Sequence, residues 1–210
     1  MKKAFLRIYI KAGIVFVVLV LFTGCFQRTK APYVVEYFTL DYSSPVVADL
    51  TSVDGLMRME RFSVAQLFNS TAMAFKPQAY RFDSYQNSRW KVSPGDMTGD
   101  FLIRDLRKAA LFKQIFSYQS DEPVRFILEG AIEEFFESDE GSASNAIFVI
   151  NVTLIDMNEK EITRRLRFHK TYQYSKALDG RSPEGFAKGM SANIALFSEQ
   201  LIKDLNFALK

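Results

Sequence analysis

The first 25 residues constrain this chain more than any other stretch. Four basic residues and no acidic ones lie in residues 1–24, and an apolar run follows over residues 12–22. A run of this length is typical of a secretory signal peptide and is too short to span a bilayer comfortably. A permanent membrane anchor is the alternative, but a span lengthened back to Phe5 would include two charged residues. The basic residues are Lys2, Lys3, Arg7 and Lys11.

The residues just before the lone cysteine favour the signal peptide. Phe22-Thr23-Gly24-Cys25 resembles the lipobox of bacterial lipoproteins, in which an apolar residue, a small residue and Gly or Ala precede the lipidated cysteine. Thr23 and Gly24 are small enough for a peptidase cleft, and the Cys25 thiol is the group that takes a diacylglycerol. Phe22 departs from the pattern, where Leu is more usual. The resemblance implies cleavage before Cys25, which then carries a covalent diacylglycerol and an N-acyl lipid.

Lipid on Cys25 would hold the chain on a membrane. Each buried CH₂ group contributes about 0.8 kcal/mol, and two acyl chains already give stable anchoring. Phe26 follows the cysteine, at a position where Asp tends to retain lipoproteins in the inner membrane. Because this position holds Phe and not Asp, analogy with other lipoproteins implies the outer membrane, with the protein facing the periplasm.

The composition limits the remaining functions. The net charge of the 210 residues is +3, but the four basic residues of the leader account for it. Beyond the leader the chain has 23 Lys and Arg and 24 Asp and Glu. This balance gives no argument for a nucleic-acid partner, and we expect none. A single cysteine excludes an internal disulfide and a multi-cysteine metal site. We expect a signal peptide over residues 1–24, a lipidated tether over 25–32 and one domain over 33–210.

Alternating and β-branched patterns predict the strands. The last three should form an antiparallel meander with Leu166 and Phe168 on its buried face and Arg167 and His169 on its wet face. We also expect a short hairpin turning at Gln86-Asn87. The predicted strands are Tyr33–Leu40, Met57–Phe68, Ala79–Ser84, Ser88–Val92, Val124–Phe135, Ala146–Leu154 and Leu166–Tyr174.

Two Ser-Pro pairs predict helix starts, because Ser can cap a helix and Pro suits its first position. Ser93-Pro94 opens a helix to about Ala110, and Ser182-Pro183 opens a second whose apolar stripe begins at Phe186. We therefore predict an α+β fold of two layers, a mostly antiparallel sheet with two principal helices packed on one side.

The sequence shows no convincing catalytic constellation. His169, the sole histidine, falls on a predicted solvent face, where an ordinary surface histidine is favoured over a general base. An acidic run lacks the spacing of a calcium loop and is interpreted as a solvated loop. We expect no catalytic residue, no metal site and no cofactor beyond the lipid. The acidic run comprises Glu133, Glu134, Glu137, Asp139 and Glu140.

Two features suggest an interaction surface, each with a plainer alternative. A basic run could bind lipid head groups or an acidic partner; it comprises Arg164, Arg165 and Arg167. Such a run more often lies on the solvent-exposed face of a sheet. The aromatic residues exceed what a thin core needs, although a Phe-rich core is the alternative. The candidate residues for this surface are Tyr80, Tyr85, Trp90, Arg165 and Arg167.

The order of several motifs resembles the ABC-type transport auxiliary lipoproteins, the family of PqiC. The resemblance covers nearly the whole mature chain; each motif is weak alone, and their order is moderately specific. The matching motifs are the lipobox, Tyr37 to Leu40, Tyr80-Arg81 with Tyr85, Arg89-Trp90 before Pro94, Leu106 to Ala110 with Phe112 and Phe116, Phe126 to Phe136, and Phe186-Ala187 with Ala192.

This resemblance implies a non-enzymatic part of a lipid-transport system. Family members partner MCE-domain tunnel proteins and inner-membrane ABC or PqiA-like components, and the lipoprotein would dock the tunnel at the outer membrane. A homo-oligomeric ring would suit that role. Two alternatives stay open: a stand-alone phospholipid carrier, which needs an enclosed apolar cavity, and an envelope hydrolase that uses a serine with an Asp or Glu.

Overall fold

The computed structural model describes residues 34–139 and 143–210. The predicted signal peptide, the lipobox with Cys25 and the tether 25–32 lie outside the described residues, as does Glu140 of the acidic run. The described part forms a mixed α+β fold with a nine-stranded sheet and two α-helices. The strands are β1 (Glu36–Phe38), β2 (Val53–Met59), β3 (Ser63–Val64), β4 (Ala72–Gln78), β5 (Arg81–Trp90), β6 (Phe112–Ser117), β7 (Phe126–Ser138), β8 (Asn145–Asp156) and β9 (Leu166–Ala177).

Strand β7 organises the sheet. One of its edges pairs with β8 in antiparallel fashion from Phe126↔Asp156 to Ser138↔Asn145, and β9 continues this ladder beyond β8. Its other edge pairs in parallel with β2, β3 and β4 in turn. The α+β class is confirmed, but the sheet is mixed, because β2 with β6 and β1 with β5 are also parallel. A meander of chain neighbours is visible in a sequence, whereas these parallel pairs join strands far apart in it.

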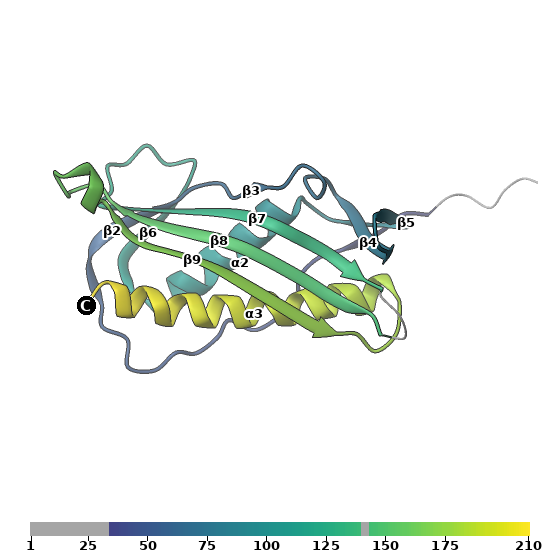
Figure 1. Ribbon diagram of the computed structural model, residues 1–210. Helices are drawn as coiled ribbons and strands as arrows, with labels where there is room; N and C mark the ends of the chain where they lie inside the picture. Colours follow the sequence, from purple (N-terminus) through teal and green to yellow (C-terminus); the bar gives the residue numbers. More distant parts are fainter. Residues whose placement is uncertain (1–33, 140–142) are drawn as a thin grey trace, which may run out of the picture. The chain divides into compact units, whose positions relative to one another are not determined.

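Helices α2 (Pro94–Ala109) and α3 (Pro183–Ala208) begin where the Ser-Pro pairs predicted. The Ser93 hydroxyl accepts a hydrogen bond from the backbone N–H of Asp96, and the Ser182 hydroxyl accepts one from Gly185. Each bond satisfies an amide that the first helical turn leaves without a partner. Both helices lie along the same side of the β7–β8–β9 ladder (Figure 1).

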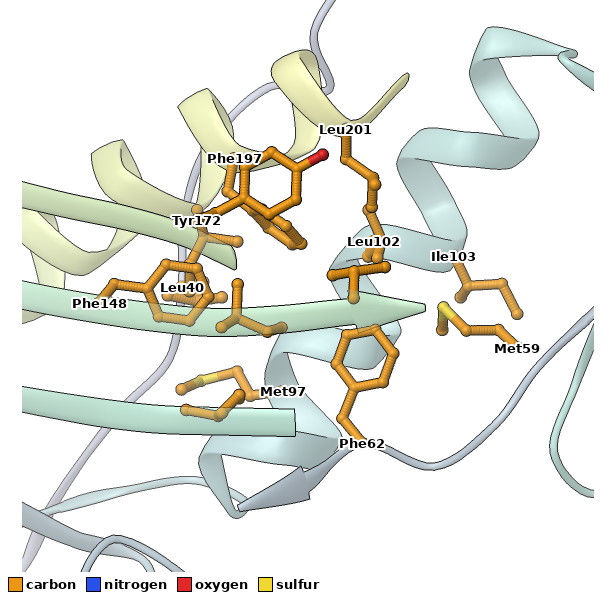
Figure 2. Close-up of a cluster of buried hydrophobic side chains, with 14 of the residues drawn as sticks. Leu40, Met59, Phe62, Met97, Leu102, Ile103, Phe148, Tyr172, Phe197 and Leu201 are labelled. Atoms are coloured by element: carbon orange, nitrogen blue, oxygen red, sulfur yellow. The ribbon is translucent and has the colours of Figure 1, made fainter. Parts of the chain in front are cut away.

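One continuous apolar cluster fills the space between the sheet and the helices. Figure 2 shows Phe197 of α3 against Tyr172 of β9, and the ring centroids are 5.2 Å apart. Leu201 of α3 lies near Leu102 of α2 in the same view, and both are fully buried. Burying each such side chain contributes about 1.5–3 kcal/mol before the entropy cost is counted.

Gly130 in β7 is required by this packing. A Cβ atom added there would lie 2.6 Å from ring carbons of Phe62, which is buried against the strand. The ring of Phe62 therefore occupies the space that any other residue at position 130 would need. The segment carrying Phe62 also interrupts the predicted strand Met57–Phe68, which the structure divides into β2 and β3.

The predicted hairpin is displaced along the chain. The structure places the turn at Ala79-Tyr80, between β4 and β5, so Gln86-Asn87 lies within β5. Tyr80 adopts a left-handed conformation with φ 64°, which a turn of this kind requires but a tyrosine seldom takes. The polar pair at residues 86–87 resembles a turn in the sequence, but its residues continue the extended strand.

The predicted faces of β9 are wrong at its start. Leu154 of β8 pairs with Phe168 but Ile155 pairs with Leu166, so the register shifts at Arg167. The extra residue turns Leu166 to the opposite face, where it is half exposed. Beyond this irregularity the expected alternation holds, with Tyr172 buried and its neighbours exposed.

Candidate interaction surfaces

The segment that follows β1 fastens the start of the domain to both helices. We call residues 39–52 the strap. Its Asp41 backbone N–H donates to the hydroxyl of Ser191 on α3 over 3.0 Å, and its Thr51 N–H donates to Oδ1 of Asn206 near the end of α3 over 2.9 Å. The strap therefore crosses most of the length of α3.

A buried carboxylate ties the strap to α2 as well. Asp105 is fully buried, and its Oδ2 accepts hydrogen bonds of 2.8 Å from the hydroxyls of Tyr42 and Ser198. Its Oδ1 accepts one of 2.8 Å from Nε of Arg104. Burial and the neighbouring carboxylate raise the pKa of Tyr42. Through these hydrogen bonds the strap, α2 and α3 meet at one charged centre, the carboxylate of Asp105 beside Arg104.

The β4–β5 hairpin projects a single tyrosine. Tyr80 at the turn is completely exposed, at 104% of its reference area. Two residues later Phe82 packs edge-on against Phe136 and Phe68, with ring centroids 5.2 Å and 5.8 Å away. Of the predicted interaction residues on the hairpin, Tyr80 alone is freely accessible.

Trp90 and Tyr85 belong instead to the interior. Trp90 is fully buried, with its ring 5.5 Å from Phe135 and 5.3 Å from Phe186. Its assignment to a surface was therefore wrong. Tyr85 is half-buried, and its hydroxyl donates a 2.8 Å hydrogen bond to Oε2 of Glu137. An aromatic-rich sequence does not show which rings the core uses, because core and interface favour the same residue types.

The acidic run is spread over different environments. Glu137 is fully buried, and burial raises the pKa of its carboxyl above its usual range. Asp139 pairs with Arg181 at 2.7 Å, whereas Glu133 on β7 accepts a hydrogen bond from Asn151. Within residues 34–139 and 143–210 there is no group of three His, Cys, Asp or Glu side chains that could hold a metal ion.

Arg165 and Arg167 lie at the end of the sheet away from Tyr80. The turn 79–80 lies beside the end of β7, whereas these arginines lie beside its start (Figure 1). Arg165 is half-buried and donates to the carbonyl oxygen of Glu159 over 2.9 Å. Arg167 lines a hollow of about 230 Å³ next to the end of α3. The five predicted surface residues therefore do not form one surface.

Exposed apolar side chains surround this arginine end. The 3₁₀ helix η1 (Ile162–Arg164) joins β8 to β9, and its Ile162 is 77% exposed. Leu166 is 56% exposed and Met157 is 41% exposed in the same connection. Arg164 pairs with Glu161 at 2.9 Å. We call Met157, Ile162 and Leu166 the η1 patch.

The face of the sheet opposite the helices is polar. His169 is exposed there, and its Nδ1 lies 3.0 Å from the hydroxyl of Thr153. Both residues line an open hollow of about 590 Å³ together with Glu129 and Asn151. The position of His169 on a solvent face agrees with the sequence prediction.

A second hollow, of about 490 Å³, lies beside α2. Arg61 reaches into it and makes a bidentate ion pair with Asp96, at 2.6 Å and 2.7 Å. Hydrogen bonds from Arg61 lower the pKa of Asp96, whereas burial and the nearby Asp96 raise the pKa of Asp100. The arginine is already matched by a carboxylate, so the hollow carries little unbalanced charge.

Sequence reasoning missed the strap and its charged centre. Asp105 and Ser198 both occupy the apolar stripes of their helices, three residues from Leu102 and Leu201. A polar side chain on a buried helix face requires a partner, which is the signal that could have indicated this site. The partner itself, Tyr42, lies 63 residues away along the chain and has no local signature.

Comparisons with known proteins concern the fold. The sequence matches no family model, and no curated protein is significantly similar to it. The structure is similar to protein XCC0632 of Xanthomonas campestris, described as DUF330, with a TM-score of 0.72 and 13% identity over 82% of this chain and 95% of that one. It is also similar to the hypothetical protein CT253 of Chlamydia trachomatis, with a TM-score of 0.52 and 10% identity over 75% of this chain and 98% of that one.

The described helices are α2, α3 and η1. None of those within residues 34–139 and 143–210 is long and apolar enough to span a bilayer.

Proposed function

We propose that this chain is a lipid-anchored auxiliary lipoprotein of an MCE/ABC-type lipid transport system, and that it acts by binding rather than by catalysis. In this proposal Cys25 carries the lipid in the outer membrane, and the domain docks a periplasmic MCE-domain tunnel there. The sequence motifs and their order support the family assignment. The likeness to the DUF330 protein supports a shared fold.

The strap is the observation that carries the proposal. Glu36, the first residue of β1, lies eleven positions after Cys25. A chain of this length reaches at most about 36–40 Å when fully extended. The strap then fixes the start of the domain to α2 and α3 through Tyr42 and Asp105. A lipid on Cys25 would thus hold the whole domain close to one membrane, as a docking module requires.

We assign the partner to the η1 patch. The patch lies at the end of the sheet away from β1 and the β4–β5 hairpin, where an anchored domain would meet a protein approaching through the periplasm. Several exposed apolar side chains within one short connection, as in the η1 patch, favour a surface that another protein covers. A ring of several copies, each presenting its η1 patch, would suit a tunnel partner.

Site-specific photo-crosslinking tests this assignment in intact cells. A photoreactive residue at Ile162 should capture an MCE-domain protein in an organism that makes one. The same residue at Lys203, on the exposed side of α3, serves as the matched control and should capture much less. If the protein reaches the membrane in normal amounts but neither position captures an MCE-domain protein, the proposed partner is contradicted.

The stand-alone carrier is not favoured by the geometry. A phospholipid carrier needs an enclosed apolar cavity for acyl chains. The hollows described above open to solvent, and the largest of them, at about 590 Å³, is lined mainly by polar residues such as Glu129, Asn151 and His169. The space between the sheet and the helices is occupied by the apolar cluster.

A further inference from the structure

The tip of the β4–β5 hairpin combines two unfavourable features in one residue. Tyr80 adopts φ 64°, a left-handed conformation that is a genuine outlier for a bulky side chain. Its ring also lies wholly in solvent, although the body of a tyrosine is apolar. Glycine or asparagine would form the same turn with less strain. The chain thus keeps a tyrosine at a position where a smaller residue would be less strained.

The hairpin presents this ring from a fixed position. Strand β4 pairs with the end of β7 through Phe75↔Glu137, so the hairpin belongs to the main sheet. Behind the tip, Phe82 packs against Phe68 and Phe136, which stack on each other with ring centroids 5.6 Å apart. Because these contacts anchor the hairpin, its tip with Tyr80 stands at one end of the sheet.

Strand β1, which the predicted tether precedes in the sequence, points toward the same end of the sheet. Strand β1 runs parallel to β5 with Glu36 opposite Ser88, so its N-terminal end points toward Tyr80. Ser88 lies seven positions after Arg81 in β5, a separation of about 23 Å. This distance is shorter than the maximal reach of the tether, about 36–40 Å. The lipid-bearing residue can therefore reach the level of the hairpin tip.

We propose that the hairpin tip docks on the phospholipid surface of the membrane that holds the anchor, with the ring of Tyr80 in the headgroup layer. This inference rests on the lipid anchor of the proposed function. Tyrosine concentrates at membrane interfaces because its ring is apolar and its hydroxyl stays hydrated. Arg81 follows it on the tip and is 59% exposed, so it can contact anionic headgroups while it pairs with Asp83 at 3.5 Å.

Tip docking would orient the domain. Strand β7 ends beside the hairpin and begins beside the η1 connection, and its 13 residues are about 40 Å long. With the tip on the membrane, the η1 patch would stand roughly that far into the periplasm. The anchor alone limits how far the domain can move from the membrane, whereas two contacts, the lipid and Tyr80, also limit its rotation.

Tryptophan fluorescence of the full lipidated protein tests the docking directly. The chain has one tryptophan, Trp90, which is fully buried and supplies a constant background. Tyr80→Trp adds an indole at the tip and keeps an interfacial aromatic ring. Tyr118→Trp adds one at another exposed tyrosine, beyond β6, as the matched control. Each protein is reconstituted into phosphatidylethanolamine and phosphatidylglycerol vesicles with or without brominated acyl chains.

The proposal predicts that the emission added by Tyr80→Trp shifts to shorter wavelength and is largely quenched by the brominated lipid. The emission of the unchanged protein and the increment from Tyr118→Trp should stay nearly constant. Protein that floats with the vesicles but shows no quenching at position 80 would overturn tip docking and leave the anchor intact. Protein that does not float with the vesicles would overturn the lipid anchor and tip docking together.

Discussion

The hydroxyl of Tyr42 donates a 2.8 Å hydrogen bond to Oδ2 of Asp105, and this contact joins the start of the domain to its helical layer. Asp105 is fully buried on α2 and also accepts from Ser198 on α3. If the proposed lipid anchor is present, a pull on it would therefore be transmitted through the strap to both helices.

Removing this hydrogen bond should loosen the strap. We expect Tyr42→Phe to lower the free energy of unfolding by about 1.5–3 kcal/mol, the range for a hydrogen bond to a charged group. Urea denaturation measures the loss, and hydrogen exchange should show faster exchange at the Asp41 amide. Tyr118→Phe, at an exposed tyrosine, should change stability by less than about 0.5 kcal/mol. Equal effects of the two substitutions would argue against a structural role for the Tyr42 hydroxyl.

A pair of glycine substitutions tests the packing of the core. Gly130→Ala would place a methyl group 2.6 Å from the ring of Phe62, so we expect a loss of about 1–3 kcal/mol. Gly99→Ala meets its nearest side-chain atom, on Met59, at an ordinary 3.7 Å within α2. That change should stabilise the protein by about 0.5–1 kcal/mol, because alanine is the better helix former. Thermal unfolding of both variants distinguishes these opposite signs, and a stable Gly130→Ala protein would contradict the packing.

The buried carboxyl of Glu137 should make stability depend on pH. Burial raises its pKa above the ordinary 4.5, so the folded protein binds this proton more tightly than the unfolded chain does. Its contribution to stability is complete below about pH 4.5 and is lost as pH rises through the raised pKa. Glu137→Gln should therefore stabilise the protein at pH 7, and the advantage over the unchanged protein should shrink toward pH 4.5.

Glu129→Gln provides the control for that pH series. Glu129 lies exposed on the same strand, and its substitution removes an equal charge. We expect little change in the urea midpoint at any pH from 4.5 to 7. A Glu137→Gln protein whose stability advantage is constant across this series would show that the carboxyl does not titrate as proposed.

The local signals of the sequence predicted the helices well and the sheet incompletely. Ser93 and Ser182 start α2 and α3 as expected, because a cap and a proline act within one turn of a helix. The long ladder β7–β8–β9 was also visible as alternation. The parallel pairing of β2, β3 and β4 with β7 was not, because no pattern within a strand specifies which distant strand it meets.

The candidate surface was harder to predict than the fold. Tyr80 and Trp90 look alike in the sequence as large aromatics near polar residues, yet one is wholly exposed and the other wholly buried. A register shift of one residue at Arg167 was enough to turn Leu166 away from the buried face. Such irregularities depend on the partner strand and leave no mark in the strand's own composition.

Lipid attachment at Cys25 can be tested by metabolic labelling. Cells fed radioactive palmitate should incorporate label into this protein, and Cys25→Ala should abolish it, because the thiol that accepts the diacylglycerol is gone. Phe22→Leu restores the more usual lipobox residue and should keep the label. Label that persists in Cys25→Ala would place the acyl group elsewhere on the chain.

The mass of the mature N-terminal peptide tests the central claim most directly. Mass spectrometry of the protein purified from the producing cell's envelope should find a chain that begins at Cys25 and carries a diacylglycerol and an N-acyl group. A chain that retains residues 1–24, or one cut in this region without lipid on Cys25, would contradict the account.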